Sequence, residues 1–189
     1  KYKQSIFDPT VHPGPEILKV QREWERNCVL ASWDTGALQD ATIRLILRGA
    51  ALTLYENHLQ LLGNQATIDD VTLAVESTVA QYLGTDPREK LQDALKKKKS
   101  ATYTVAKHYT QFLNQADLIT YLPGGNNIPL APSDLLSHYK KAMPKHWMDN
   151  AKKAGLRFQT VQEAYDYCQM QEELESEEAF QPKRHQQDA

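Results

Sequence analysis

The residues of this sequence that could carry chemistry are two cysteines, six histidines and scattered carboxylates. Cys28 and Cys168 each fall on an apolar helical stripe, where a thiol behaves as a small hydrophobe with a raised pKa. The histidines are His12, His58, His108, His138, His146 and His185. They form no HExxH pair, and none stands beside a carboxylate at the spacing of a metal site. The sequence therefore predicts no catalytic residue and no metal ligand.

The known nucleotide-binding and hydrolase motifs are also missing. Gly124 and Gly125 form a glycine pair, but the surrounding loop lacks the Lys and Ser or Thr with which a P-loop holds phosphate and magnesium. The sequence has no GxSxG elbow that would expose a nucleophilic serine. Asp69 and Asp70 fall at the start of an expected helix, where the helix dipole favours negative charge. We expect no cofactor and no enzymatic activity.

Two features remain as candidate contacts with a partner. The first is the run Lys96, Lys97, Lys98 and Lys99, which could touch nucleic acid or another anion. The alternative, a solvated helix end whose cations complement the dipole, is favoured because the run has no Arg or interleaved aromatic residues. The second is Trp147, which follows a proline at a helix start and fits an interface anchor as well as a core residue.

Composition narrows the class of protein. Of the 189 residues, 41% are hydrophobic, 22 are Lys or Arg and 24 are Asp or Glu. This balance does not fit a protein built around phosphate binding, and two cysteines give no disulfide framework. No apolar run of about 18 residues is present, so we expect a soluble, cytoplasmic protein without a membrane partner. Because the sequence does not begin with Met, we expect a fragment of a longer protein.

Proline placement and hydrophobic periodicity then define the elements. Between residues 16 and 122 Pro87 is the only proline, which suits helices because an interior proline costs about 3 kcal/mol. Apolar residues recur every three or four positions, and no stretch alternates as a strand does. The predicted fold class is all-α, with about eight helices over 15–31, 37–62 (one helix or two, broken near Gly49), 67–83, 86–99, 101–122, 133–143, 144–155 and 160 onward.

Particular residues set the ends of these helices. Thr67 and Asp70 predict a capping box, and Gly84 a helix stop. Ser133 is expected to cap one late helix and Thr160 to begin the last. Within 37–62 the expected buried stripe is Leu38, Ala41, Leu45, Gly49, Leu52, Tyr55, Leu59 and Leu62. The segment between Gly84 and Pro87 is the expected linker between a lobe at 1–85 and a lobe at 86–180, with a polar tail at 181–189.

Several degenerate motifs then follow in a recognisable order. A Phe in the N-terminal arm precedes a helix that contains a Trp, and a motif of small residues that ends in an aromatic residue comes next. A Tyr then closes the first half of the chain, and a helix with a Tyr and a Phe follows in the second half. The residues are Phe7, Trp24, Leu47, Gly49, Ala51, Tyr55, Tyr82, Tyr109 and Phe112. Over residues 5 to 175 this order resembles the capsid region of Gag proteins from LTR retrotransposons of the Ty3/Gypsy or Copia type. Tyr55 stands where that family has Trp, and the family's zinc knuckle is absent.

The resemblance implies a two-lobed retroviral-type capsid fold whose motif residues lie in the core. It implies a structural protein that assembles with itself, in pentamers and hexamers with two-fold contacts, into an intracellular virus-like particle that packages RNA. RNA contact is expected mainly outside this chain. The alternative is a domesticated Gag-derived or unrelated helical adaptor that binds a partner peptide in a groove. A third class, an all-α enzyme or nucleic-acid-binding regulator, has no support from the motifs.

Overall fold

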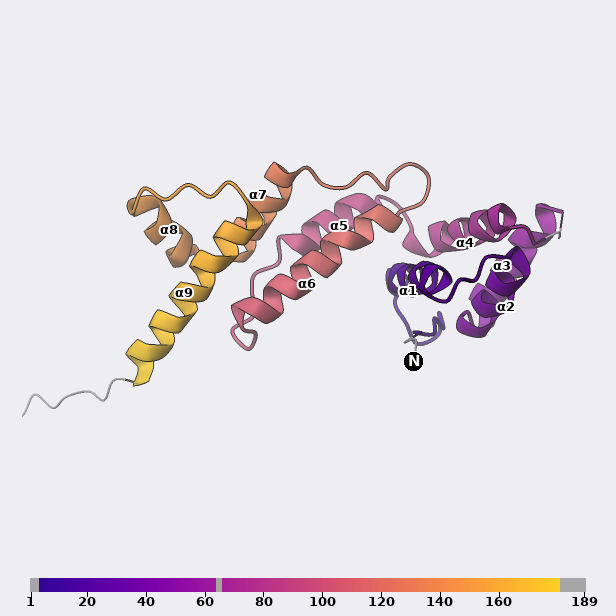
Figure 1. Ribbon diagram of the computed structural model, residues 1–189, viewed down its shortest axis with the longest axis horizontal. Coiled ribbons are helices and arrows are strands. Elements are labelled where there is room, and N and C mark those ends of the chain that lie inside the picture. Colours follow the sequence, from indigo (N-terminus) through magenta and orange to yellow (C-terminus); the bar gives the residue numbers. More distant parts are fainter. Residues whose placement is uncertain (1–3, 64–65, 181–189) are drawn as a thin grey trace, which may run out of the picture. The chain divides into compact units, whose positions relative to one another are not determined.

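The computed structural model describes residues 4–63 and 66–180, with side chains to residue 177 (Figure 1). Within these ranges the all-α prediction is confirmed, and the one β feature is an isolated parallel bridge between Phe7 and Leu47. The helices are α1 (Glu16–Leu30), α2 (Gly36–Ile46), α3 (Gly49–Leu61), α4 (Ile68–Leu83), α5 (Pro87–Leu95), α6 (Val105–Asp117), the 3₁₀ helix η1 (Leu118–Tyr121), α7 (Pro132–Ala142), α8 (Lys145–Lys153) and α9 (Val161–Phe180).

The chain divides into two compact units. The first unit comprises residues 1–90 and 117–128, and the second comprises 91–116 and 129–189. The predicted lobes, 1–85 and 86–180, stay a prediction, and residues 117–128 form the longest stretch that the compact units assign differently. The predicted polar tail at 181–189 lies outside the described residues.

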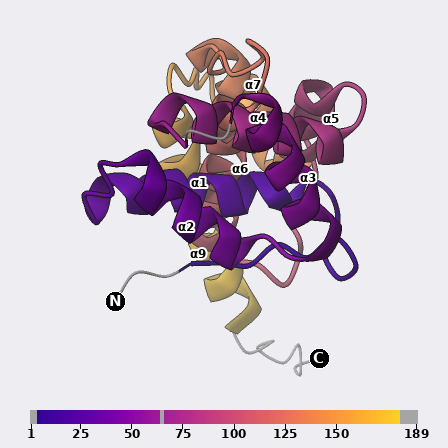
Figure 2. The ribbon, with the colours of Figure 1, turned by 90° about the vertical axis from the view of Figure 1, so that its right-hand side faces the viewer.

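The first unit packs α1 to α4 around one apolar core (Figures 1 and 2). α1 buries the periodic residues Ile17, Val20 and Trp24, as its spacing predicts. The indole Nε1–H of Trp24 donates to Thr42 Oγ1 at 3.0 Å, which satisfies the one polar atom of the buried ring. η1 packs against α1, where Arg22 and Asp117 form an ion pair at 3.3 Å.

A bridge to the N-terminal arm breaks 37–62 into two helices. Phe7 N–H donates to the carbonyl of Ile46 at 2.8 Å, and Arg48 N–H donates to the carbonyl of Phe7 at 2.9 Å. Leu47 between them is extended, so it cannot continue α2. Gly49 then starts α3 with φ +53°, a conformation that L side chains rarely adopt.

The core of the second unit is an aromatic cluster around Tyr139 of α7, whose side chain is fully buried. Phe112 and Tyr109 of α6 meet its ring edge-on, with centroids 5.1 and 5.8 Å away. Tyr165 of α9 stacks on Tyr109 at 4.3 Å. Aromatic pairs in these geometries add to the free energy gained by area burial, so the cluster fixes α6, α7 and α9 together.

The helix ends confirm some sequence predictions and correct others. The Thr67–Asp70 capping box of α4 is present in both directions. Ser133 does not cap α7, because the helix begins one residue earlier with Pro132 at its first position. Thr160 accepts the Glu163 N–H at 3.1 Å and so caps α9 from just outside it.

Two helices are shorter than their periodicity predicts. α5 ends at Leu95 rather than at Lys99, because the next residues bond to α7: Lys99 N–H donates to the carbonyl of Ala142 at 2.8 Å. The predicted helix at 101–122 begins at Val105 and ends as the 3₁₀ turn η1. Glu172 of α9 accepts the Val105 N–H at 2.8 Å and thereby satisfies a free amide at the start of α6.

Candidate interaction surfaces

The residues that carry the family resemblance are mostly core residues. Six have buried side chains, and these are Phe7, Trp24, Leu47, Ala51, Tyr55 and Phe112. Tyr82 and Tyr109 are half-buried, and Tyr82 meets the Phe7 ring edge-on at 5.2 Å. Gly49 is exposed, and a Cβ added to it would meet nothing within 4 Å. Gly49 therefore does not lie in the core, contrary to what the resemblance implies, and it marks instead the break between the two helices.

α2 faces the core with the opposite side from the one its strongest apolar stripe predicts. The buried residues are Gly36, Gln39, Ile43 and Ile46. The expected core stripe is on the outside: Leu38 is 47% exposed, Leu45 is 66% exposed, and Ala41 between them is exposed. Gln39 can lie on the buried face because its side-chain amide donates a hydrogen bond to the carbonyl of Trp33 at 2.8 Å. We call Leu38, Ala41 and Leu45 the α2 apolar face.

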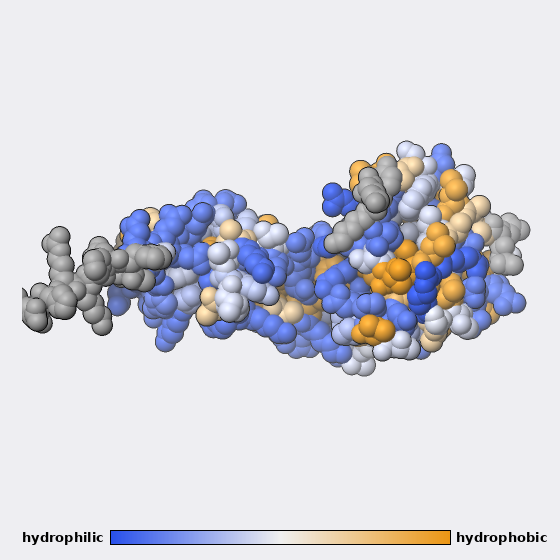
Figure 3. All heavy atoms as spheres, turned by 90° about the horizontal axis from the view of Figure 1, so that it is seen from below, coloured by the Kyte–Doolittle hydropathy of each residue, from blue (hydrophilic) through white to orange (hydrophobic). Residues whose placement is uncertain are grey.

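A further apolar side chain, that of Ile68, is exposed near the start of α2. The backbone at Gly36 packs so closely on Ala66 and Thr67 that a Cβ there would fall 1.8 Å from the Ala66 carbonyl oxygen. This contact holds the start of α2 beside the start of α4, where Ile68 is 41% exposed. In the view of Figure 3, hydrophobic residues gather over the first unit, whereas the second is mostly hydrophilic.

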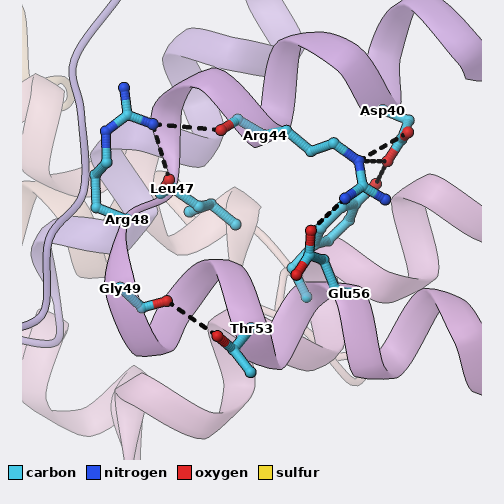
Figure 4. A network of polar contacts seen from close by, with 8 residues as sticks. Asp40, Arg44, Leu47, Arg48, Gly49, Thr53 and Glu56 are labelled. Atoms are coloured by element: carbon cyan, nitrogen blue, oxygen red, sulfur yellow. Dashed lines mark hydrogen bonds and ion pairs between the residues drawn. The ribbon is translucent and has the colours of Figure 1, made fainter.

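A charged network joins α2 to α3 beside the α2 apolar face (Figure 4). The Nε–H of Arg44 donates to both carboxylate oxygens of Asp40, one turn before it, at 2.8 and 3.0 Å, and the Nη1–H of Arg44 donates to Glu56 of α3. The buried Tyr55 hydroxyl donates to Asp40 at 2.8 Å. Burial and the Asp40 carboxylate raise the pKa of Tyr55, and hydrogen bonding to Asp40 raises that of Arg44. These contacts link α2 to α3.

The Lys96–Lys99 run is largely engaged within the second unit. Lys96 pairs with Asp93 at 2.6 Å. Lys98 Nζ donates to the carbonyls of Lys141 and Met143 at 2.5 and 3.2 Å, and so compensates the C-terminus of α7 rather than that of α5. Lys99, with only 8% of its side chain exposed, pairs with Glu172 at 3.1 Å. Lys97 is exposed.

Trp147 is a core residue with 3% of its surface exposed, which settles the two predictions left open for it. Its Nε1–H donates to Glu175 at 2.6 Å, and Lys99 Nζ lies 5.8 Å from its ring centroid. Hydrogen bonds from Trp147 and then from His146 lower the pKa of Glu175. The buried ring thus has a hydrogen bond to one charged group and lies near another, so its contacts belong to the interior of the second unit.

The thiols are poor nucleophiles. Burial, followed by the nearby Glu25, raises the pKa of Cys28 to about 11. Burial, followed by Glu172, raises the pKa of Cys168 to about 12. Both remain protonated at neutral pH, and the thiolate is the reactive form.

Two further properties concern metals and membranes. Within residues 4–63 and 66–180, no group of three or more His, Cys, Asp or Glu is arranged to hold a metal ion. No helix among the described residues combines the length and the apolar character needed to cross a bilayer.

No family model, curated protein or solved structure matches this chain.

Proposed function

We propose that this chain is the capsid subunit of an LTR-retrotransposon Gag protein, which assembles with copies of itself into a particle that packages RNA. The observation that carries the proposal is the α2 apolar face. Leu38, Ala41 and Leu45 follow helical spacing and are left exposed, although a packed core lies on the other side of the same helix. The order of capsid-like motifs along the sequence supports the same conclusion.

Covering the α2 apolar face with a second copy would be energetically favourable. Isolated exposed leucines are ordinary, but two leucines and an alanine in one stripe offer the small, repeated contact that a symmetric shell requires. Burying both leucines at about 25 cal/mol per Å² contributes a few kcal/mol for each contact. The formal net charge of −2 adds little self-repulsion between copies.

The experiment compares particle or ring formation by the unaltered chain with that of Leu38→Glu/Leu45→Glu, followed by light scattering and negative-stain microscopy over a range of concentrations. The matched control is Leu113→Glu/Leu156→Glu, which replaces two exposed leucines of the second unit (38% and 48% exposed) and adds the same charge. We expect the unaltered chain and the control to assemble and the α2 variant to stay monomeric, with all three equally helical by circular dichroism.

A chain that stays monomeric at every concentration and salt contradicts the proposal. The alternative of an adaptor predicts that result together with tight binding of one partner peptide. Equal loss of assembly in both double variants would also contradict the proposal, because it would assign the effect to added charge rather than to the α2 apolar face.

A further inference from the structure

Lysines from three separate segments come together on the second unit. Lys96, Lys97 and Lys98 follow α5, Lys140 and Lys141 end α7, and Lys145 and Lys152 belong to α8; all seven are exposed. Only the first group forms a run in the sequence. We call these seven residues the lysine surface.

Direct contacts join the first two segments. Lys98 Nζ reaches the carbonyls of Lys141 and Met143, so the end of the first run lies against the end of α7. The pKa of His138, one turn before Lys141, is lowered by burial and then by the charges of Lys96 and Lys141. The carboxylates of Asp134 and Asp93 act on this pKa in the opposite direction and rank below the two lysines, so lysines of both segments lie near the ring.

A surface hollow joins α7 to α8. It has a volume of about 330 Å³ and is lined by Ser133, Leu136, Ser137, Lys140, Lys141 and Met148. On α8, Lys145 and Lys152 stand three residues before and four residues after Met148, which places them on the same helix face. The lining of the hollow therefore combines hydroxyl and ammonium donors with the apolar side chains of Leu136 and Met148, and two further lysines share the helix face of Met148.

Charge is strongly divided within this unit. Residues 91–116 and 129–157 contain eleven Lys and Arg and three acidic residues, Asp93, Asp134 and Asp149. Residues 158–180 contain seven acidic residues and no Lys or Arg. The near-neutral total thus conceals a basic region and an acidic helix α9, and only the basic region carries the hollow.

We propose that the lysine surface binds the phosphate backbone of single-stranded RNA, with the hollow between α7 and α8 receiving one nucleotide. The inference deepens the proposed packaging function and rests on it for the choice of RNA. Lysines act as point charges on phosphate, and Ser133 and Ser137 can donate hydrogen bonds to phosphate oxygens. The hollow is lined by no Arg and no aromatic ring, so we expect binding without base specificity.

The test measures binding of a fluorescein-labelled oligouridylate of about 20 nucleotides by anisotropy, at several salt concentrations. The protein concentration is kept below that at which scattering detects assembly. Lys140→Gln/Lys141→Gln is compared with Lys19→Gln/Lys90→Gln, which removes the same charge from exposed positions of the first unit. Polyglutamate of equal charge serves as a competitor.

We expect the α7 variant to bind the oligouridylate about tenfold more weakly, and the slope of its log affinity against log salt to be smaller by about 1.4. The affinity of the control variant should change less than about twofold. Equal losses in the two variants, or no salt-dependent binding by the unaltered chain, would overturn the inference. Competition by polyglutamate as strong as that by unlabelled RNA would overturn it too, since the surface would then be one for acidic protein segments. These outcomes are independent of assembly, which the α2 variant tests separately.

Discussion

The two units leave different kinds of side chain on their surfaces. Of the fifteen large apolar residues that are exposed among the described residues, eleven belong to the first unit and four to the second. The second unit instead exposes the lysine surface and the acidic helix α9. An apolar surface is stabilised by being covered, whereas a charged surface is stabilised by water or by counter-charge. The difference agrees with the two proposals, in which the first unit carries self-association and the second unit binds a polyanion.

The interiors differ as well. In the first unit the buried indole of Trp24 donates to a neutral hydroxyl, that of Thr42. In the second, Trp147 donates to the carboxylate of Glu175 and lies under the ammonium of Lys99. Hydrogen bonds to charged groups are roughly twice as strong as neutral ones, so the two tryptophans offer a direct way to compare the units.

The largest effect is expected from removing these rings. Trp147→Ala should lower the free energy of unfolding by about 3–5 kcal/mol, because it leaves a cavity and deprives Glu175 of its indole donor. Trp24→Ala should fall at the lower end of that range. Urea denaturation followed by circular dichroism measures both, and a greater loss for Trp24→Ala would contradict the contrast between a neutral and a charged environment.

A smaller effect is expected at the carboxylate that joins α9 to α6. Glu172→Ala should cost about 2 kcal/mol, because it leaves the nearly buried Lys99 without its partner and the Val105 amide without an acceptor. Glu172→Gln keeps an oxygen to accept the amide and should recover part of the loss. Urea denaturation measures the loss in both variants. Equal losses would show that the hydrogen bond from the Val105 backbone amide contributes nothing to stability.

In the first unit, Tyr55→Phe should cost about 1 kcal/mol, because it removes one hydrogen bond to Asp40 while Arg44 remains paired with that carboxylate. The same urea denaturation measures the loss. The variant also tests whether the network holds the α2 apolar face, and we expect assembly to need a higher protein concentration. Unchanged stability together with unchanged assembly would show that the Tyr55 hydroxyl contributes to neither.

The smallest effect concerns protonation in the second unit. The pKa of His138 is lowered by burial and by Lys96 and Lys141, against the opposing influence of Asp134 and Asp93. The neutral ring therefore adds stability above its unfolded pKa of about 6.5, and this contribution is lost as the pH falls through the folded pKa. Lys96→Gln should raise the pKa of His138 in an NMR titration; a fall would contradict a positive potential at the lysine surface.

The sequence predicts the class and most helix positions because periodicity and capping are local. It predicts the break at Gly49 only as one of two possibilities, since the cause is a bridge to Phe7, forty residues away in the sequence from Leu47. It also assigns the wrong face of α2 to the core. α2 carries two apolar stripes, one with Leu38 and Leu45 and the other with Ile43 and Ile46. The second stripe is the buried one. Periodicity alone cannot say which of two apolar stripes meets the core.

The candidate surfaces were less accessible to sequence reasoning. The sequence shows the Lys96–Lys99 run, but it does not show that its members have different roles. Lys99 is nearly buried, and Lys98 caps another helix. Lys140, Lys141, Lys145 and Lys152 join it only through tertiary packing. The one available signal was the separation of charge between residues 91–157 and 158–180, which the near-neutral total conceals.

Association of this chain through an apolar face is the central proposal, and the salt dependence of self-association tests it most directly. Sedimentation velocity of the unaltered chain, at one protein concentration and rising sodium chloride, gives the fraction assembled. We predict that assembly holds or increases as salt rises, because salt screens charge pairs and leaves apolar burial intact. Dissociation of the assembly as salt rises would contradict this proposal, because the copies would then be held together by contacts between the charged surfaces of the second unit.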